Sequence, residues 1–297
     1  MHAAIAEPRA DNRLHGILLV GAATLMWSTA GLFTRGIDLD LWTLVGWRSL
    51  FACLTLLAYA AHRDGRAAFD LGRRLGWRGL VYVPAAAVSM LGYIAALRLT
   101  TVANVMTIYA TMPFVCAGIA WLLMRERVTR DVVIASGVAF AGVVFMAGSA
   151  TAPGDVAGNA LALLMTAAFA GTVVMARHWR GFDVTLGTAC AAGLCALVCG
   201  LLAERGVPSP AELGLLFLFS LCTQSLSYLL FLAGGRQIPG AESGLIALLD
   251  VVLAPLWVWI AFAETPGTPA LVGGALTLSA VTWYMARQLA RRPRGDR

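Results

Sequence analysis

The feature that most constrains this chain is an apolar segment that occurs twice, in residues 93–126 and again in residues 228–264. Three residues of the first copy recur in the second at a constant offset of 138 positions, since 241−103, 259−121 and 264−126 agree: Ala103, Trp121 and Glu126 correspond to Ala241, Trp259 and Glu264. Each copy is apolar for long enough to cross a bilayer. The chain is therefore predicted to hold matched membrane segments.

The remaining sequence is apolar in the same way. Of its 297 residues 59% are hydrophobic and 13% charged, whereas about a quarter of a soluble domain is charged. Ten runs approach the roughly 20 apolar residues that a spanning helix needs: 15–34, 41–61, 79–97, 101–124, 131–150, 155–176, 184–203, 213–233, 241–262 and 270–288. The predicted fold is an all-α polytopic membrane protein with ten transmembrane helices.

The distribution of arginine predicts the orientation, because basic residues concentrate in cytoplasmic loops. All 22 basic residues are Arg. With ten spans, only Arg35, Arg98 and Arg205 fall in loops on one side, Arg48 lies inside a span, and the other arginines fall on the opposite side. Both termini are therefore expected in the cytoplasm of a cell whose inner membrane holds the protein.

Five spans per half mean that the second half enters the membrane from the opposite side. Residues 1–150 and 151–297 are predicted to be two inverted repeats around a central cavity, which is a transporter architecture. Small residues such as Ala135, Ala139 and Gly273 recur at helical spacing in the fifth and tenth runs and predict close helix packing.

Several function classes are disfavoured by what the sequence lacks. Without lysine there is no P-loop and no Schiff base. The six cysteines lie in apolar runs and the four histidines at helix ends or in tails, so neither metal nor cofactor is expected. Intramembrane hydrolysis would need paired aspartates or a Ser/His couple, so an enzyme is a distant alternative. The net charge of +6 reflects orientation rather than a nucleic-acid partner, and no removable signal peptide is predicted.

Two charges fall inside predicted spans. Asp250 lies about nine residues, or roughly 14 Å, from the cytoplasmic start of its helix, where an acid faces a cavity or a partner. It is predicted to contact a substrate ammonium group or to carry a proton; the alternative is a structural bond to a neighbouring helix. Arg48 could bind a substrate carboxylate, but packing or a helix-end contact is the favoured interpretation.

Polar and aromatic residues of several spans are expected to line the cavity, because small-ligand pockets combine an apolar wall with a few polar groups. Gln224 and Tyr228 share one helix face, and Tyr228 corresponds to Tyr93. Packing or lipid contact is the alternative for any single one of them. With Asp250, the predicted binding residues are Trp27, Tyr93, Met106, Thr107, Tyr109, Met165, Gln224, Tyr228 and Trp257.

Two stretches carry a family resemblance. Residues 100–104, Pro113 and residues 121–127 resemble the first-repeat signature of EamA-type transporters, in the drug/metabolite transporter superfamily; residues 249–259 up to Glu264 resemble the second. There the family commonly has Glu where Asp250 stands and Pro where Val251 stands. The resemblance implies ten helices in two inverted repeats and export of amino acids or other small metabolites. The resemblance is strongest to the bacterial aromatic amino acid exporters of this family.

The expected function is export of small metabolites by alternating access, with aromatic and apolar amino acids favoured as substrates. Coupling is either facilitated or linked to protons. The alternatives are export of another metabolite or a drug. Since each chain supplies both halves, a monomer could suffice. Pro113 and Pro255 lie inside matched spans and are expected to kink them.

Overall fold

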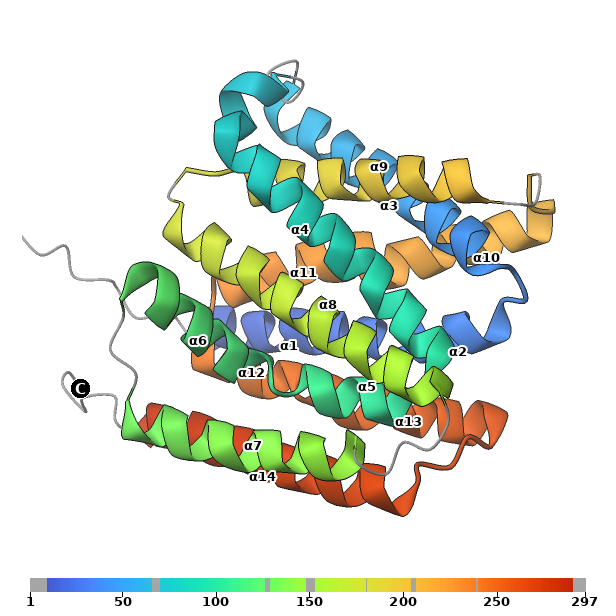
Figure 1. The fold of residues 1–297 in the computed structure, drawn as a ribbon. Helices are drawn as coiled ribbons and strands as arrows, with labels where there is room; N and C mark the ends of the chain where they lie inside the picture. Colours follow the sequence, from blue (N-terminus) through green and yellow to red (C-terminus); the bar gives the residue numbers. More distant parts are fainter. Residues whose placement is uncertain are drawn as a thin grey trace, which may run out of the picture.

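The structure is a computed structural model that describes residues 10–65, 70–125, 129–147, 153–179, 181–203, 207–238 and 240–290. Within those residues every regular element is a helix (Figure 1). The first half contains α1 (Ala10–Ser28), α2 (Ala30–Gly36), α3 (Leu41–Asp64), α4 (Leu71–Leu99), α5 (Val102–Tyr109), α6 (Met112–Met124) and α7 (Arg130–Ala147). The second contains α8 (Pro153–His178), α9 (Val184–Leu202), α10 (Pro210–Ser220), the π-helix η2 (Leu221–Ser225), α11 (Leu226–Gly235), α12 (Gly240–Ala247), α13 (Leu249–Phe262) and α14 (Thr268–Ala290).

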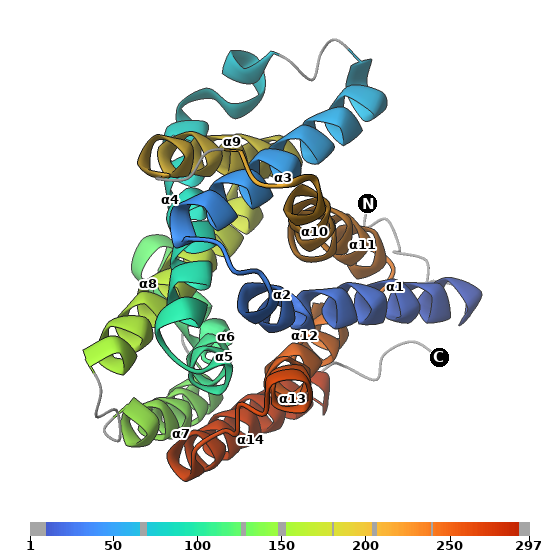
Figure 2. The same cartoon turned by 90° about the vertical axis from the view of Figure 1, so that its right-hand side faces the viewer.

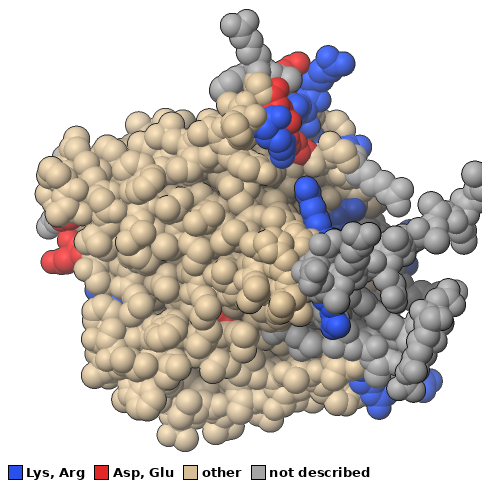
Figure 3. Space-filling view, turned by 180° about the vertical axis from the view of Figure 1, so that it is seen from behind, with Lys and Arg blue, Asp and Glu red and all other residues tan. Residues whose placement is uncertain are grey.

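The composition of these helices is that of a multi-pass membrane protein. Eight helical segments of the described residues are long and apolar enough to cross a bilayer. The two predicted spans outside that set, 131–150 and 241–262, are helical as α7, as far as residue 147, and as the α12–α13 pair. Charged side chains gather at the two ends of the bundle, and the broad face between them is nearly free of charge (Figure 3).

Several spans that were expected to be continuous are interrupted. The first is divided at Thr29 between α1 and α2, the fourth at Ala110–Thr111 between α5 and α6, and the ninth at Leu248 between α12 and α13. At the second break, Pro113 stands in the first turn of the new helix α6, where its missing N–H is tolerated. Pro255 lies inside α13, beyond the break at Leu248.

The two copies of the repeated segment have the same local structure. Helices α5 and α12 begin and end 138 positions apart, as 240−102 and 247−109 agree. Both following helices end at a left-handed residue, Arg125 with φ 53° and Ala263 with φ 55°, again 138 positions apart. In Figure 1, α5 and α6 run from right to left, whereas α12 and α13 run from left to right. The two copies are thus antiparallel.

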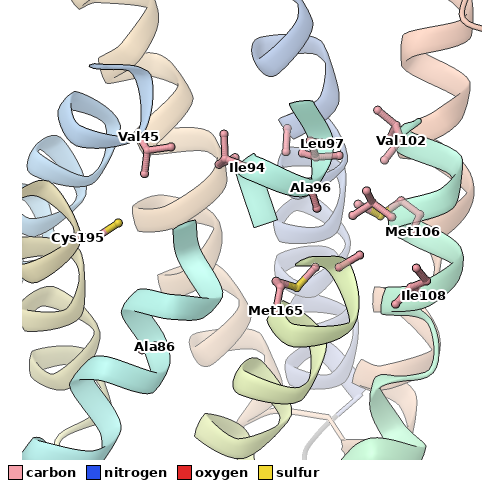
Figure 4. Close-up of a cluster of buried hydrophobic side chains, with 14 of the residues drawn as sticks. Val45, Ala86, Ile94, Ala96, Leu97, Val102, Met106, Ile108, Met165 and Cys195 are labelled. Carbon is pink, nitrogen blue, oxygen red and sulfur yellow. The ribbon is translucent and has the colours of Figure 1, made fainter. Parts of the chain in front are cut away.

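The helices pack in pairs that combine both halves of the chain. Helix α3 packs on α9, α4 on α8, α1 on α11 and α7 on α14, with α3 and α9 at one edge of the bundle and α7 and α14 at the other (Figure 2). Between them lies a core of buried apolar side chains from several helices, including Val45, Ile94, Met106 and Met165 (Figure 4).

One end of the bundle is tied by an ion pair that links three connections. The Arg35 guanidinium donates to Glu264 Oε2 at 2.8 Å and to the backbone carbonyls of Leu97 and Thr100 at 2.7 and 2.9 Å. The other Glu264 oxygen accepts from the Val102 N–H at 3.1 Å, in the first turn of α5. A carboxylate at a helix N-terminus is stabilising. This ion pair therefore fixes α2, the α4–α5 connection and the end of α13 together.

Helices α7 and α14 meet at glycine, as the small residues predicted. A Cβ added at Gly273 would lie 2.5 Å from the Gly142 carbonyl oxygen, and Ala135 and Ala139 are buried. Thr277 Oγ1 also donates to the Ala139 carbonyl at 3.2 Å. The two backbones approach each other as closely as small residues permit.

Gly273→Ala is therefore expected to destabilise the protein by about 1–3 kcal/mol, because the new methyl group meets backbone that cannot rotate away. The matched control is Gly137→Ala in α7, where an added Cβ meets no atom within 4 Å; it should gain up to about 1 kcal/mol from helix propensity. Thermal unfolding of the purified variants in detergent compares the two. Equal shifts in Tm would contradict the close α7–α14 contact.

Candidate functional site

A cavity of about 170 Å³ lies between helices of both halves. Helix α4 contributes one face, in which Tyr82, Ala86, Ser89, Met90 and Tyr93 follow the helical period. Helix α8 faces it with a second stripe at the same spacing. The α8 stripe is Met165, Phe169 and Thr172. The other lining residues come from seven further helices and η2: Trp27, Ala30, Arg48, Tyr109, Thr188, Thr223, Gln224, Tyr228 and Asp250.

The structure brings together most of the residues predicted to bind substrate. Seven of the ten line this cavity: Trp27, Tyr93, Tyr109, Met165, Gln224, Tyr228 and Asp250. The other three do not. Met106 is buried in the apolar core, Thr107 donates its hydroxyl to the Ala103 carbonyl of its own helix, and Trp257 Nε1 donates to Ser28 Oγ at 2.9 Å. That any of them binds a substrate stays a prediction.

Asp250 owes its position to the break at Leu248. It stands in the first turn of α13, which begins directly after that break. The residue is 6% exposed, and its Oδ1 has no hydrogen-bond partner among the described residues. Neither the structural ion pair nor the interhelical hydrogen bond that the sequence left open is seen in the described part of the chain.

Arg48 also lines the cavity, although the sequence favoured a packing role for it. The residue is 2% exposed on α3. Its Nε and Nη2 donate to Thr223 Oγ1 at 3.2 and 2.9 Å, and its Cζ lies 4.6 Å from the centre of the Phe219 ring. The third nitrogen, Nη1, has no partner among the described residues. The ion pairs found in those residues include neither Arg48 nor Asp250.

A short π-helix shapes this part of the wall. Residues Leu221–Ser225 form η2 between α10 and α11, and single π turns are frequent at functional sites. Thr223 donates its hydroxyl to the Phe219 carbonyl at 2.7 Å, so its oxygen is free to accept from Arg48. The neighbouring Gln224 is 8% exposed, and neither atom of its amide has a partner among the described residues.

Sequence reasoning missed other residues of the wall. Continuing the helical period backward from Tyr93 would have identified Tyr82, Ser89 and Met90. Continuing it forward from Met165 would have identified Phe169 and Thr172. Thr223 carried no readable signal, because an apolar run does not reveal a π turn. The aromatic residues stand in pairs: ring centroids lie 6.1 Å apart for Tyr109 and Phe169 and 5.0 Å apart for Trp27 and Phe231.

A cavity lined by helices of both halves of a chain is typical of membrane carriers. Residues 14–148 match the EamA-like transporter family. The match covers less than half of the chain, and the matched family is one of transporters. Within the matched residues lie Arg48, the α4 stripe and the α5–α6 break.

A solved structure described as "Crystal structure of protein" is 20% identical in sequence and has a TM-score of 0.67. The comparison covers 94% of this chain and 99% of the other. At this identity the likeness shows the fold alone. No curated protein matches the chain.

The geometry around Arg48 predicts that Thr223→Val lowers the free energy of unfolding by about 2–3 kcal/mol, because a buried guanidinium loses its hydrogen-bond acceptor. Thr223→Ser keeps the hydroxyl and should retain most of the stability. The matched control is Thr172→Val, in the same cavity, whose hydroxyl bonds only the Phe169 carbonyl of its own helix; its loss should stay within about 1 kcal/mol. Thermal unfolding in detergent ranks the three variants, and equal losses at both threonines would contradict the role of Thr223.

Proposed function

We propose that the whole chain is an EamA-type exporter of small metabolites, with amino acids as substrates and aromatic and apolar ones favoured. Residues 1–150 and 151–297 are its two inverted repeats, and together they supply ten transmembrane helices around the cavity. The observation that carries this proposal is one cavity between the two halves whose described wall combines aromatic rings with one cation, Arg48, and one anion, Asp250.

The size and charge of the cavity favour this cargo over its rivals. Pockets for drug-sized ligands measure about 300–1,000 Å³, which is larger than the about 170 Å³ found here. A nucleotide-linked sugar carries phosphates and would need several cations, whereas Arg48 is the only cation in the described wall. An amino acid is small, carries one charge of each sign, and can place an apolar side chain against Tyr109, Phe169 and Met165.

Alternating access is supported by the construction of the bundle. Broken helices from matched positions border a central site, as in carriers whose repeats rock against each other. The Arg35–Glu264 ion pair ties one end of the bundle, and the proposed mechanism releases it when that end opens. The concentration of arginine at the other end supports an inner-membrane protein with both termini in the cytoplasm.

Two modes of coupling fit the site. Facilitated transport needs only the cavity, whereas proton antiport would use Asp250, which interacts electrostatically with Tyr93 and Tyr109. An imposed pH gradient distinguishes them. Each chain supplies both repeats, so the proposed functional unit is a monomer.

The test is counterflow in liposomes that contain purified protein and unlabelled phenylalanine. Labelled phenylalanine and tryptophan should enter in exchange with saturable kinetics, and labelled glucose should not. Liposomes without protein control for leakage. If exchange is present, net uptake that follows an imposed pH gradient identifies proton coupling, and uptake indifferent to the gradient identifies the facilitated mode. If protein that is shown to be folded exchanges none of the amino acids, the proposed substrate class is contradicted.

A further inference from the structure

Three polar side chains of one cavity lack the partners that buried groups ordinarily have. They are the Nη1 of Arg48, both amide atoms of Gln224, and the Oδ1 of Asp250, each without a hydrogen bond among the described residues. All three residues are more than nine-tenths buried and all line the same wall. More than about 90% of buried polar groups in proteins are hydrogen-bonded. These three exceptions, together with the Tyr228 hydroxyl in the same cavity wall, which also lacks a partner among the described residues, therefore call for a common explanation.

We infer that Arg48 and Asp250 are the two poles of a site for a zwitterion, in which Arg48 binds the carboxylate and Asp250 binds the ammonium group of a free amino acid. This inference rests on the proposed function and specifies its substrate chemistry. Gln224 supplies a donor and an acceptor for the same polar atoms. A molecule with only one of the two charges leaves one pole of the site buried and unpaired.

The surroundings of each charge suit the group assigned to it. Thr223 occupies Nε and Nη2 of Arg48 and holds the guanidinium in place, so Nη1 is left to donate to a carboxylate oxygen. Tyr109 lines the same cavity as Asp250, and its ring is paired with Phe169. Aromatic faces attract cations, so an ammonium group at Asp250 also meets a favourable wall.

The two charges do not neutralise each other, which is what makes both available. No ion pair within 4.0 Å joins them in the described structure, yet Tyr93 interacts electrostatically with both. Tyr93 lines the same cavity as both charges. Arg48 comes from α3 in the first half and Asp250 from α13 in the second, so a bound zwitterion connects the two halves.

The experiment removes one charge at a time from the protein and from the ligand. Binding to purified protein is measured by the rise in Tm with ligand concentration, because a ligand of the folded state stabilises it. The ligands are phenylalanine, phenethylamine, which lacks the carboxylate, and 3-phenylpropionate, which lacks the ammonium group. The wild-type protein should bind phenylalanine at least about tenfold more tightly than either analogue, as expected for one lost charged hydrogen bond.

Each charge-removing variant should bind phenylalanine more weakly but should bind the analogue that lacks the corresponding ligand charge as well as before. Asp250→Asn is expected to weaken phenylalanine about ten- to a hundredfold while 3-phenylpropionate binds as well as before. Arg48→Gln should weaken phenylalanine similarly while phenethylamine is unaffected. Asp250→Glu and Arg48→Lys keep the charges and should retain the wild-type order of ligands. Matched controls outside the cavity are Asp70→Asn, which keeps an N-cap side chain on α4, and Arg236→Gln at the exposed end of α11.

The possible outcomes separate this inference from the function on which it rests. If wild-type protein binds phenylalanine but both variants keep its order of ligands, or show the reverse pattern, the assignment of the poles is overturned and the transporter stands. If folded wild-type protein neither binds nor exchanges any amino acid, the proposed substrate class fails and the inference fails with it. If a charge-removing variant does not fold, the variant that keeps the charge at the same position, Asp250→Glu or Arg48→Lys, is measured instead. The inference requires that this variant bind the three ligands in the wild-type order of affinity, and a different order overturns it.

Discussion

Two opposite charges are held in an apolar interior without neutralising each other, and much of the structure serves that arrangement. An ion removed from water loses several kcal/mol of hydration, so each charge needs local compensation. Arg48 has the hydroxyl of Thr223 and the face of the Phe219 ring. Asp250 stands in the first turn of α13, where the helix dipole favours an anion. The π turn and the break at Leu248 supply these two environments.

The break before Asp250 does not depend on a proline at the matching position. In the first copy, Pro113 stands in the opening turn of α6; 138 positions later the chain has Val251, yet the helix is interrupted at Leu248 as it is at Ala110. Proline alone therefore does not account for the interruption. One tertiary contact holds the second copy: Trp257 of α13 donates to Ser28 at the end of α1, next to the break at Thr29.

The sequence predicted the features that follow from periodicity and hydropathy. Apolar length predicted the helices, the offset of 138 predicted the matched copies, and Asp250 was identified because an acid in an apolar run is conspicuous. The sequence could not predict the features that depend on three-dimensional packing. The helix breaks and the π turn are local departures from a period that the sequence does not mark, and they decide that Thr223 meets Arg48. Around α5, Met106 lies about 60° and Thr107 about 160° from Tyr109, so the rotation of the helix about its own axis decides which of the three lines the cavity.

The two charged residues in the described wall of the cavity, Arg48 and Asp250, do not recur at the matching positions of the other half. The Asp40 and Asp183 side chains accept from the N–H groups of Thr43 and Leu186 at the starts of α3 and α9, so these helices match at an offset of 143. By that offset Arg48 corresponds to Ala191, and by the offset of 138 Asp250 corresponds to Met112. Each half thus contributes one charge that the other lacks. A conformational equilibrium shifts only when a ligand binds its states differently. In the proposed mechanism a zwitterion that bridges Arg48 and Asp250 would meet this condition, because rocking of the halves would change the separation of its two partners.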